Sequence, residues 1–345
     1  MRAKEKSGLL ERPWLALSLV LLAGLIFGYL VAGIRFSSRE KSLIDQIHPV
    51  RANNAAYTFI NPLLGYSIPN TQQFNNFQNL QQQLGIFTDA QKQKGAATDI
   101  SIYFRDMNLG RWTGLDENEK YDPASMLKVA IMFAYYKQAE IDPQILSQSI
   151  VYSNALDSQI NDIPFQTPSE LKVGKSYSVE QLIETMIIDS DNGAKNALLA
   201  DVSDSALNAV YSDLDIPAPS DNAAYTISPK DFSLFFRILY NASYLDQPLS
   251  EKALQLLNRA TYKDGLLAGV PGGIKVAQKF GEHINYDDNK NPTTSELHDC
   301  GIVYYPAHPY VLCVMTKGTS LDALTSIIKN VSQIVYQNID SLYKK

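Results

Sequence analysis

The segment Tyr121-Asp-Pro-Ala-Ser-Met-Leu-Lys128 holds a serine and a lysine at a spacing that suits nucleophilic chemistry. Residues three apart on a helix share a face, so the Ser125 hydroxyl and the Lys128 amine are expected within reach of each other. The first turn of a helix also offers free backbone N–H groups and the positive end of the helix dipole, which favour a developing oxyanion. Lys128 could then accept the serine proton, provided that burial and a second cation lower its pKa.

The Ser-x-x-Lys pattern is weak by itself, because the chain contains five copies of it. The other four are Ser38–Lys41, Ser169–Lys172, Ser326–Lys329 and Ser341–Lys344. Only Ser125 precedes a strongly apolar helix, Met126 to Tyr136, directly after a strand region. The alternative interpretation of Ser125 is a serine that merely begins a helix.

Two further motifs strengthen the catalytic interpretation. Ser190-Asp191-Asn192 follows an apolar helical run that should break at Gly193, so its loop could present a hydroxyl and an amide. Lys279-Phe280-Gly281 ends a strand-like run from Gly273, and we expect that strand to be central in the sheet and to run beside the Ser125 helix. Similar tripeptides in settings typical of turns or loops are Ser220-Asp221-Asn222, Lys172-Val173-Gly174 and Lys263-Asp264-Gly265.

Strand patterns lie at both ends of the region that holds these motifs. Ile100, Ile102 and Phe104 alternate with more polar residues, and Asn108–Gly110 supplies a turn, which predicts a hairpin. Strands resume at Gly273–Phe280 and at Gly301–Thr316, with a turn at Pro306–Pro309. The sheet of this α/β fold must therefore be closed by distant parts of the chain.

Helical patterns fill the rest. An amphipathic helix is expected around Phe74, Phe77, Leu80 and Leu84, and a closing helix from Leu321 to about Tyr343. Residues 123–260 are mostly helical. In that stretch Ser178 and Gln181 form a capping box, and Ser228 and Ser250 each begin an apolar run.

The two cysteines, Cys300 and Cys313, lie symmetrically about the Pro306–Pro309 turn and could face each other across a hairpin. Two buried apolar thiols are the more common arrangement for such residues. The sequence leaves the choice open.

Trp14 to Ile34 is a run of 21 residues without a charge, about 32 Å long as a helix, which matches a bilayer core. The run is long for a cleaved signal peptide, so we expect an uncleaved anchor. Residues 35–70 are polar with scattered prolines, as expected of a tether. Flanking charges are balanced and give no orientation: Arg2, Lys4, Lys6 and Arg12 precede the run, and Arg35, Arg39, Lys41 and Arg51 follow it.

The composition and the absence of certain motifs argue against several classes of function. The net charge is −6 and the chain has no basic block beyond its N-terminus, which argues against nucleic acid. It has no C-x-x-C and no closely spaced histidine pair, so neither a metal nor another cofactor is expected. Because the chain also lacks G-x-S-x-G, a Ser-His-Asp hydrolase is disfavoured, and the four histidines are expected to be structural.

The ordered set Ser125-x-x-Lys128, Ser190-x-Asn192 and Lys279-x-Gly281 resembles the three signature elements of class A β-lactamases and penicillin-binding proteins. Stretches 190–199, 226–231 and 298–304 are similar to family segments as well. The resemblance covers about residues 71–345. It implies an antiparallel sheet flanked by helices, with an all-α subdomain at about 123–260.

The resemblance also implies roles for individual residues. Ser125 would attack an amide carbonyl, Lys128 would take its proton, and Ser190 would relay a proton to the leaving nitrogen. The backbone N–H groups of Ser125 and Glu282 would form the oxyanion hole. Substrate would be bound by Asn192, Lys279, Phe280 and Gly281, with Lys279 attracting a carboxylate and helping to keep Lys128 neutral.

Two departures from the family pattern affect this expectation. Class A β-lactamases carry a glutamate that activates the deacylating water, whereas this chain has no glutamate between Glu184 and Glu251. Asp213, Asp215 and Asp221 lie in that interval without the expected context. Phe280 stands where the family has a threonine or serine, so it offers no hydroxyl to a substrate carboxylate.

The sequence therefore predicts a cytoplasmic N-terminus at 1–13, a single membrane span at 14–34, a tether at 35–70 and an extracytoplasmic serine hydrolase domain at 71–345. The expected partners are the lipid bilayer and either a β-lactam or a peptidoglycan stem peptide. Alternatives are a D-alanyl-D-alanine peptidase and a non-catalytic penicillin-binding module. The oligomeric state stays open.

Overall fold

The computed structural model describes residues 22–24, 26, 48–51, 56–67, 77–153, 164–165, 169–219, 224–289 and 292–344. Two compact units divide the chain, one made of residues 1–48 and 66–75 and the other of residues 49–65 and 76–345. Nearly all of the expected membrane span at 14–34, and also Phe74, lie outside the described residues. Within the described ranges, no helix has the length and apolar character needed to cross a bilayer.

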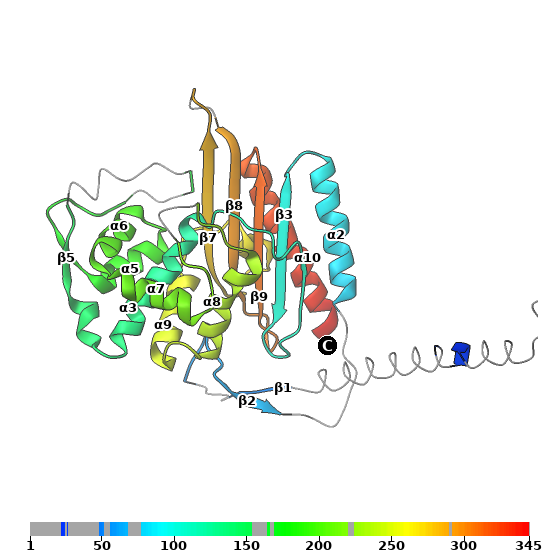
Figure 1. Cartoon of the computed structure of the whole chain (residues 1–345), viewed down its shortest axis with the longest axis horizontal. Coiled ribbons are helices and arrows are strands. Elements are labelled where there is room, and N and C mark those ends of the chain that lie inside the picture. The colour runs from blue at the N-terminus through cyan, green and yellow to red at the C-terminus, as the bar shows by residue number, and fades with distance from the viewer. Residues whose placement is uncertain are drawn as a thin grey trace, which may run out of the picture. The chain divides into compact units, whose positions relative to one another are not determined.

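A five-stranded antiparallel sheet in the order β4-β3-β9-β8-β7 forms the centre of the larger unit (Figure 1). Its strands are β3 (Asp99–Asp106), β4 (Trp112–Leu115), β7 (Val276–Tyr286), β8 (Pro292–Val303) and β9 (Tyr310–Gly318). The expectation that the Lys279 strand is central in the sheet is wrong, because among the described strands β7 pairs with β8 alone and forms an edge. One side of β7 is thereby left for the segment that carries Ser125.

The hairpin of β7 and β8 is longer than the sequence pattern indicated. Its strands continue to Tyr286 and begin again at Pro292, in a stretch expected to be a loop, because polar residues there still complete a ladder. The hairpin of β8 and β9 turns at Pro306–Pro309 as predicted and pairs Cys300 with Cys313. These two cysteines form a disulfide, which decides the question that the sequence left open.

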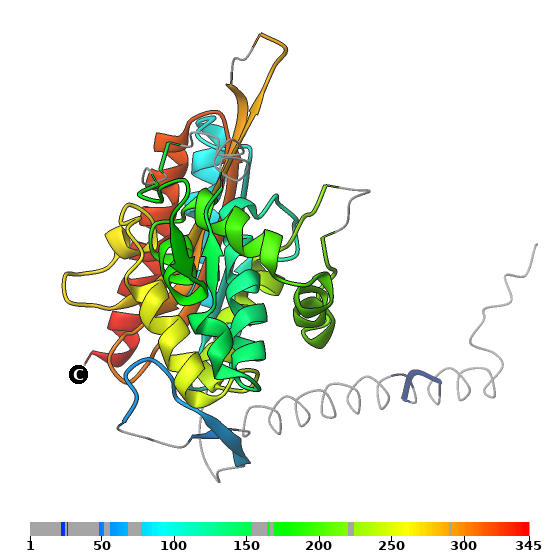
Figure 2. The same cartoon turned by 90° about the vertical axis from the view of Figure 1, so that its left-hand side faces the viewer.

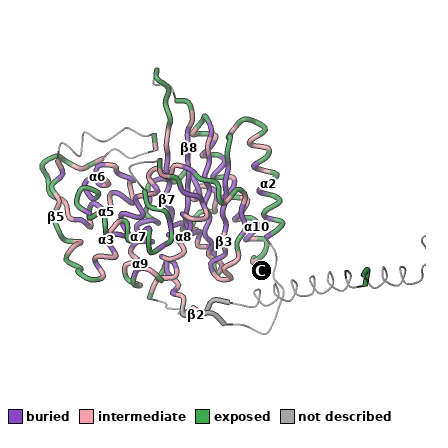
Figure 3. The backbone as a smooth tube through the Cα atoms, viewed as in Figure 1, coloured by how far each residue is buried: buried purple, intermediate pink, exposed green. Residues whose placement is uncertain are grey.

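Helices cover both faces of the sheet. One face packs against α2 (Gln78–Gln93) and α10 (Leu321–Tyr343), drawn in cyan and red in Figure 1. The strand side chains on this face of the sheet, such as Ile102, Leu312 and Val314, pack against these helices. The other face packs against α8 (Pro229–Asn241) and α9 (Gln247–Asn258). Figure 3 shows the middle of the sheet as largely buried and the tip of the β7–β8 hairpin as exposed.

The helical subdomain lies in front of the sheet in the view of Figure 2. Its elements are η2 (Ala124–Leu127), α3 (Lys128–Ala139), η3 (Pro143–Ser147), β5 (Ser149–Val151), β6 (Ser176–Ser178), α5 (Val179–Ile188), α6 (Asn192–Asp201) and α7 (Asp204–Asp213). The capping box of Ser178 and Gln181 and the cap at Ser228 are confirmed. Ser250 does not begin a helix, because Asp246 already caps α9 four residues earlier. The 3-10 helix η4 (Leu266–Gly269) precedes β7.

A segment before α2 also packs on this unit. Strands β1 (His48–Arg51) and β2 (Leu63–Ser67) pair with each other, and the residues between them include the buried Phe59 and Ile60. The buried carboxylate of Glu251 accepts the backbone N–H groups of Thr58, Phe59 and Ile60 at 2.8 to 3.0 Å. Part of the stretch expected to be a tether therefore belongs to the folded unit.

Candidate active site

Ser125 lies in the short helix η2, three residues before α3 begins at Lys128. The preceding residue, Ala124, has a positive φ of 47°, a conformation that residues other than glycine adopt rarely. Two hydrogen bonds hold this turn: the Ala124 N–H donates to Asp122 Oδ1 at 2.8 Å and the Met126 N–H to the Pro123 carbonyl at 2.9 Å. Since Ser125 is only half-buried, its hydroxyl stays accessible.

Two side chains of β8 hold the turn from behind. Glu296 accepts the Asp122 N–H at 3.0 Å, and His298 Nε2 lies 2.9 Å from the Asp122 carbonyl oxygen. His298 Nδ1 accepts the Thr316 N–H at 3.2 Å, so this nitrogen carries no proton and Nε2 is the one that donates. Sequence reasoning treated His298 as structural and did not connect it with Ser125.

The Lys128 amine is at the centre of the site. Its Nζ lies 2.9 Å from Ser125 Oγ, 2.8 Å from Asn192 Oδ1 and 3.2 Å from Ser190 Oγ, and it also donates to the Ser190 carbonyl oxygen. A neutral amine has two hydrogens and one lone pair. The Ser190 carbonyl and the Asn192 amide oxygen can take the two hydrogens, which leaves the lone pair for the Ser125 hydroxyl.

The surroundings of Lys128 favour that neutral state. Burial is the main cause that holds its pKa well below the usual value, and the positive charges of Lys279 and Lys195 lower it further. The carboxylates of Asp191 and Glu282 act in the opposite direction but do not cancel the effect. The same environment lowers the pKa of Lys279 to about 7, again mainly by burial.

The loop from Ser190 to Gly193 is shaped by its own residues. Ser190 has a positive φ of 56°, and the Asp191 side chain caps α6 by accepting the Ala194 N–H at 2.7 Å. A Cβ atom at Gly193 would lie 2.5 Å from the Tyr152 hydroxyl, so only glycine fits. Ser190 and Asn192 are thereby presented to Lys128, while Asp191 is used to hold the loop.

Strand β7 brings Lys279 to the same point. Lys279 Nζ lies 2.8 Å from Ser190 Oγ, so Ser190 bridges the two lysines. A Cβ atom at Gly281 would lie 2.4 Å from the Pro123 carbonyl oxygen, which explains why glycine is needed there. This close approach puts the N–H groups of Ser125 and Glu282, expected to form an oxyanion hole, on neighbouring segments.

Phe280 is only 4% exposed and belongs to an aromatic stack on the α10 side of the sheet. Its ring stacks on Tyr262 at 4.3 Å, and Tyr262 in turn contacts Phe165 at 5.4 Å between ring centroids. Lys279 Nζ lies 4.5 Å from the centre of the Phe280 ring. Phe280 therefore packs the lysine rather than offering a polar group.

The Glu282 side chain is a feature that sequence reasoning missed, because only its backbone N–H was considered. It is 3% exposed, and Oε1 accepts the Phe165 N–H at 2.9 Å. The second oxygen, Oε2, is buried and has no hydrogen-bond partner within the described ranges of the chain. Burial raises the pKa of this carboxyl to about 7.

The competing motifs are not assembled in this way. Lys263 donates to the Ala260 carbonyl, and Gly174 has the positive φ typical of a turn. Ser220–Asn222 lies outside the described residues. Asp213 is exposed and accepts the Tyr244 hydroxyl at 2.9 Å. Within the part of the chain that the structure describes, no group of three or more potential ligands is placed to hold a metal ion.

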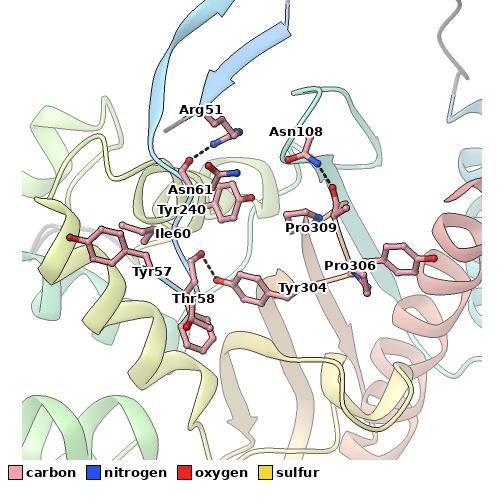
Figure 4. Close-up of a pocket in the computed structure, with 13 residues that line it drawn as sticks. Arg51, Tyr57, Thr58, Ile60, Asn61, Asn108, Tyr240, Tyr304, Pro306 and Pro309 are labelled. Carbon is pink, nitrogen blue, oxygen red and sulfur yellow. Dashed lines mark hydrogen bonds between the residues drawn. The ribbon is translucent and has the colours of Figure 1, made fainter. Parts of the chain in front are cut away.

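A separate pocket of about 750 Å³ lies beside the N-terminal segment (Figure 4). Arg51, Tyr240 and Tyr304 are among its lining residues. Arg51 contacts the Asn61 carbonyl and the Asn241 amide, and the Tyr304 hydroxyl donates to the Phe59 carbonyl at 3.0 Å. None of the residues around Ser125 lines this pocket.

A model of the Beta-lactamase enzyme family matches residues 80–339. A mutant of PBP-A, solved as an acyl-enzyme complex with penicillin G, superposes with a TM-score of 0.63 at 22% identity, covering 79% of this chain and 100% of PBP-A. No curated protein gives a significant match.

Two β-lactamase structures are similar to the same extent. One, from Xanthomonas campestris pv. campestris, has a TM-score of 0.63 at 20% identity and covers 75% of this chain and 98% of its own. A class A β-lactamase from Mycobacterium abscessus has a TM-score of 0.62 at 19% identity, covering 75% and 99%. At these identities the similarity establishes the shared fold.

Proposed function

The chain belongs to the β-lactamase enzyme family, and we propose that it is a membrane-anchored serine hydrolase that β-lactams or cell-wall peptides acylate at Ser125. One observation carries this proposal. Lys128 Nζ lies 2.9 Å from Ser125 Oγ, and burial holds the pKa of Lys128 well below the usual value, which favours the neutral amine that a general base requires.

Acylation follows from these contacts. Lys128 accepts the proton as Ser125 Oγ forms a bond to the amide carbonyl carbon, and the N–H groups of Ser125 and Glu282 bind the oxyanion. When the C–N bond breaks, the Ser190 hydroxyl passes a proton to the leaving nitrogen. The protonated Lys128 can replace that proton, because its Nζ lies 3.2 Å from Ser190 Oγ.

Release of the acyl group is expected to be slow. The described part of the interval from Asn192 to Lys279 places no carboxylate in contact with Lys128 or Ser125. Asp213, one of the three aspartates in that interval that lack the family's sequence context, accepts the Tyr244 hydroxyl at the surface. A long-lived acyl-enzyme is typical of a penicillin-binding protein, and this favours a D-alanyl-D-alanine peptidase as the second candidate function.

The proposed location is the outer face of the cytoplasmic membrane, with residues 14–34 as the anchor and the N-terminus inside. The charge-free run of 21 residues supports the anchor. The disulfide of Cys300 and Cys313 supports an oxidising compartment for the domain. Cell-wall peptides and β-lactams are both met there.

A fluorescent penicillin tests the proposal. The wild-type protein should gain a covalent adduct on Ser125, visible by intact-protein mass spectrometry, and Ser125→Ala should gain none. Ser341→Ala, which alters a serine of a competing Ser-x-x-Lys pair, is the matched control and should react normally. Absence of an adduct at millimolar drug would leave the non-catalytic module as the better description.

A further inference from the structure

The buried Glu282 carboxylate lacks a full set of hydrogen bonds. Among the residues that the structure describes, its Oε1 has one donor, the Phe165 N–H, and its Oε2 has none, although the side chain is only 3% exposed. A buried carboxylate oxygen without a partner is unfavourable, so such a group is retained where something else supplies the donor. A bound substrate with an N–H group would supply the missing donor to Oε2.

Glu282 lies beside the candidate active site. It follows Gly281, whose backbone touches the turn that carries Ser125. Its negative charge acts on both lysines of the site, since it raises the pKa of Lys128 and of Lys279 against the effect of burial. The carboxylate therefore lies within electrostatic range of the reacting groups.

The charges around Lys279 do not suit an anion. The fully buried Asp299 and Glu282 both oppose its positive charge, and Asp299 Oδ2 is already fixed by the Leu266 N–H at 2.8 Å. Phe280 has no hydroxyl to donate, and its ring is engaged with Tyr262. A substrate carboxylate here would gain little from Lys279 and would be repelled by Glu282.

We propose that Glu282 makes the site select substrates that present a hydrogen-bond donor, such as a carboxamide or an ammonium group, where relatives bind a carboxylate. The proposal rests on the function proposed above and names its substrate class. Glu282 Oε2 accepts the donor, and the leaving-group side of the substrate is neutral or cationic. A peptide with an amidated terminus has this chemistry.

Equilibrium binding to the Ser125→Ala protein tests recognition separately from chemistry. The probes are benzylpenicillin and its carboxamide, which differ only in the group at issue, and calorimetry gives both Kd values. We expect the carboxamide to bind at least tenfold more tightly. In the Ser125→Ala protein, a second substitution Glu282→Ala should remove the preference for the carboxamide, and Glu282→Gln should reduce that preference at least threefold. The exposed Glu119→Gln is the control for an equal change of charge and should leave the ratio unchanged.

The outcomes separate the two proposals. Tighter binding of the carboxylate, or a ratio that Glu282→Ala changes by less than twofold, overturns the role of Glu282, even if Ser125 of the wild type is acylated. The wild-type protein with both probes gives the acylation and release rates. A Glu282→Gln variant that keeps the binding ratio but no longer releases the acyl group would overturn the proposal and show instead that Glu282 activates the deacylating water. Selective binding without any Ser125 adduct would overturn only the catalytic function.

Discussion

Glu251 and Glu282 are two buried glutamates to which the fold gives opposite surroundings. Glu251 is 6% exposed, and three backbone N–H groups of residues 58–60 saturate its oxygens. Glu282 is 3% exposed and receives one N–H, and its second oxygen has no partner in the part of the chain that the structure describes. The first carboxylate joins two distant parts of the chain. The second lies beside the candidate active site, on the edge strand β7.

The difference teaches how to separate a structural charge from a functional one. A carboxylate whose hydrogen bonds are complete stabilises the fold, and removing it leaves donors unpaired. An incompletely bonded carboxylate beside two lysines costs stability, and the cost is tolerated where binding or catalysis uses the group. Mutations in the two regions should therefore change different properties.

The largest effect is expected for Glu251→Ala. Three N–H groups would lose their carboxylate acceptor, so the free energy of unfolding should fall by about 3 kcal/mol. The loss cannot grow much larger, because residues 56–61 can detach and let water accept from these N–H groups. Urea denaturation measures the change. Glu119→Ala is the exposed control, and the acylation rate of the folded variant should stay within twofold. A loss below about 0.5 kcal/mol would show that Glu251 does not hold the segment.

Gly281→Ala should damage the catalytic region. The new Cβ would lie 2.4 Å from the Pro123 carbonyl oxygen and force β7 away from the Ser125 turn, so acylation should slow about 100-fold. Stopped-flow acylation by a chromogenic β-lactam measures it. Gly85→Ala in α2 meets nothing within 4 Å and serves as the control. Normal acylation in Gly281→Ala would disprove the tight contact.

Glu282→Gln should change stability with a definite pH dependence. Burial raises the pKa of this carboxyl from 4.5 to about 7 in the folded state. The ionised carboxylate therefore destabilises the wild type increasingly as pH rises from about 4.5 to 7, and not below that window. Relative to wild type, the variant should gain about 2 kcal/mol between pH 4.5 and 8. Denaturation at both pH values checks this, and a constant difference would contradict it.

Lys195→Gln should have the smallest effect. Lys195 lowers the pKa of Lys128 through its positive charge, after burial and Lys279. Its removal should raise that pKa, so the acidic limb of the pH profile for acylation should move to higher pH by less than about one unit. Lys92→Gln, far along the chain on α2, is the control. A shift to lower pH would argue against Lys128 as the base.

Local sequence patterns determined much of the fold. The closing helix from Leu321 to Tyr343, the capping box at Ser178 and the Cys300–Cys313 register were predictable, because each depends on neighbours in the chain or on a single turn. The polar stretch 281–295 was not predicted as a hairpin. Its strands are specified by backbone pairing rather than by an apolar pattern.

The candidate site was predictable only as a set of residues. Motif order pointed to Ser125, Lys128, Ser190, Asn192 and Lys279, and the structure brings these five together. Their spacing alone could not show that Ser190 bridges the two lysines, because that contact joins a loop to a strand 89 residues away.

Tertiary structure alone decided what the acidic residues do. Glu251, Glu282 and Glu296 are chemically the same side chain. Nothing in their flanking sequence shows that the first binds the N-terminal segment, that the second lies near Lys128, or that the third supports the Ser125 turn. The distinction depends on which N–H groups the folded chain brings to each oxygen. Those donors come from residues 117 to 193 positions away. Sequence fixes the chemical groups, whereas long-range packing sets their burial, partners and charge.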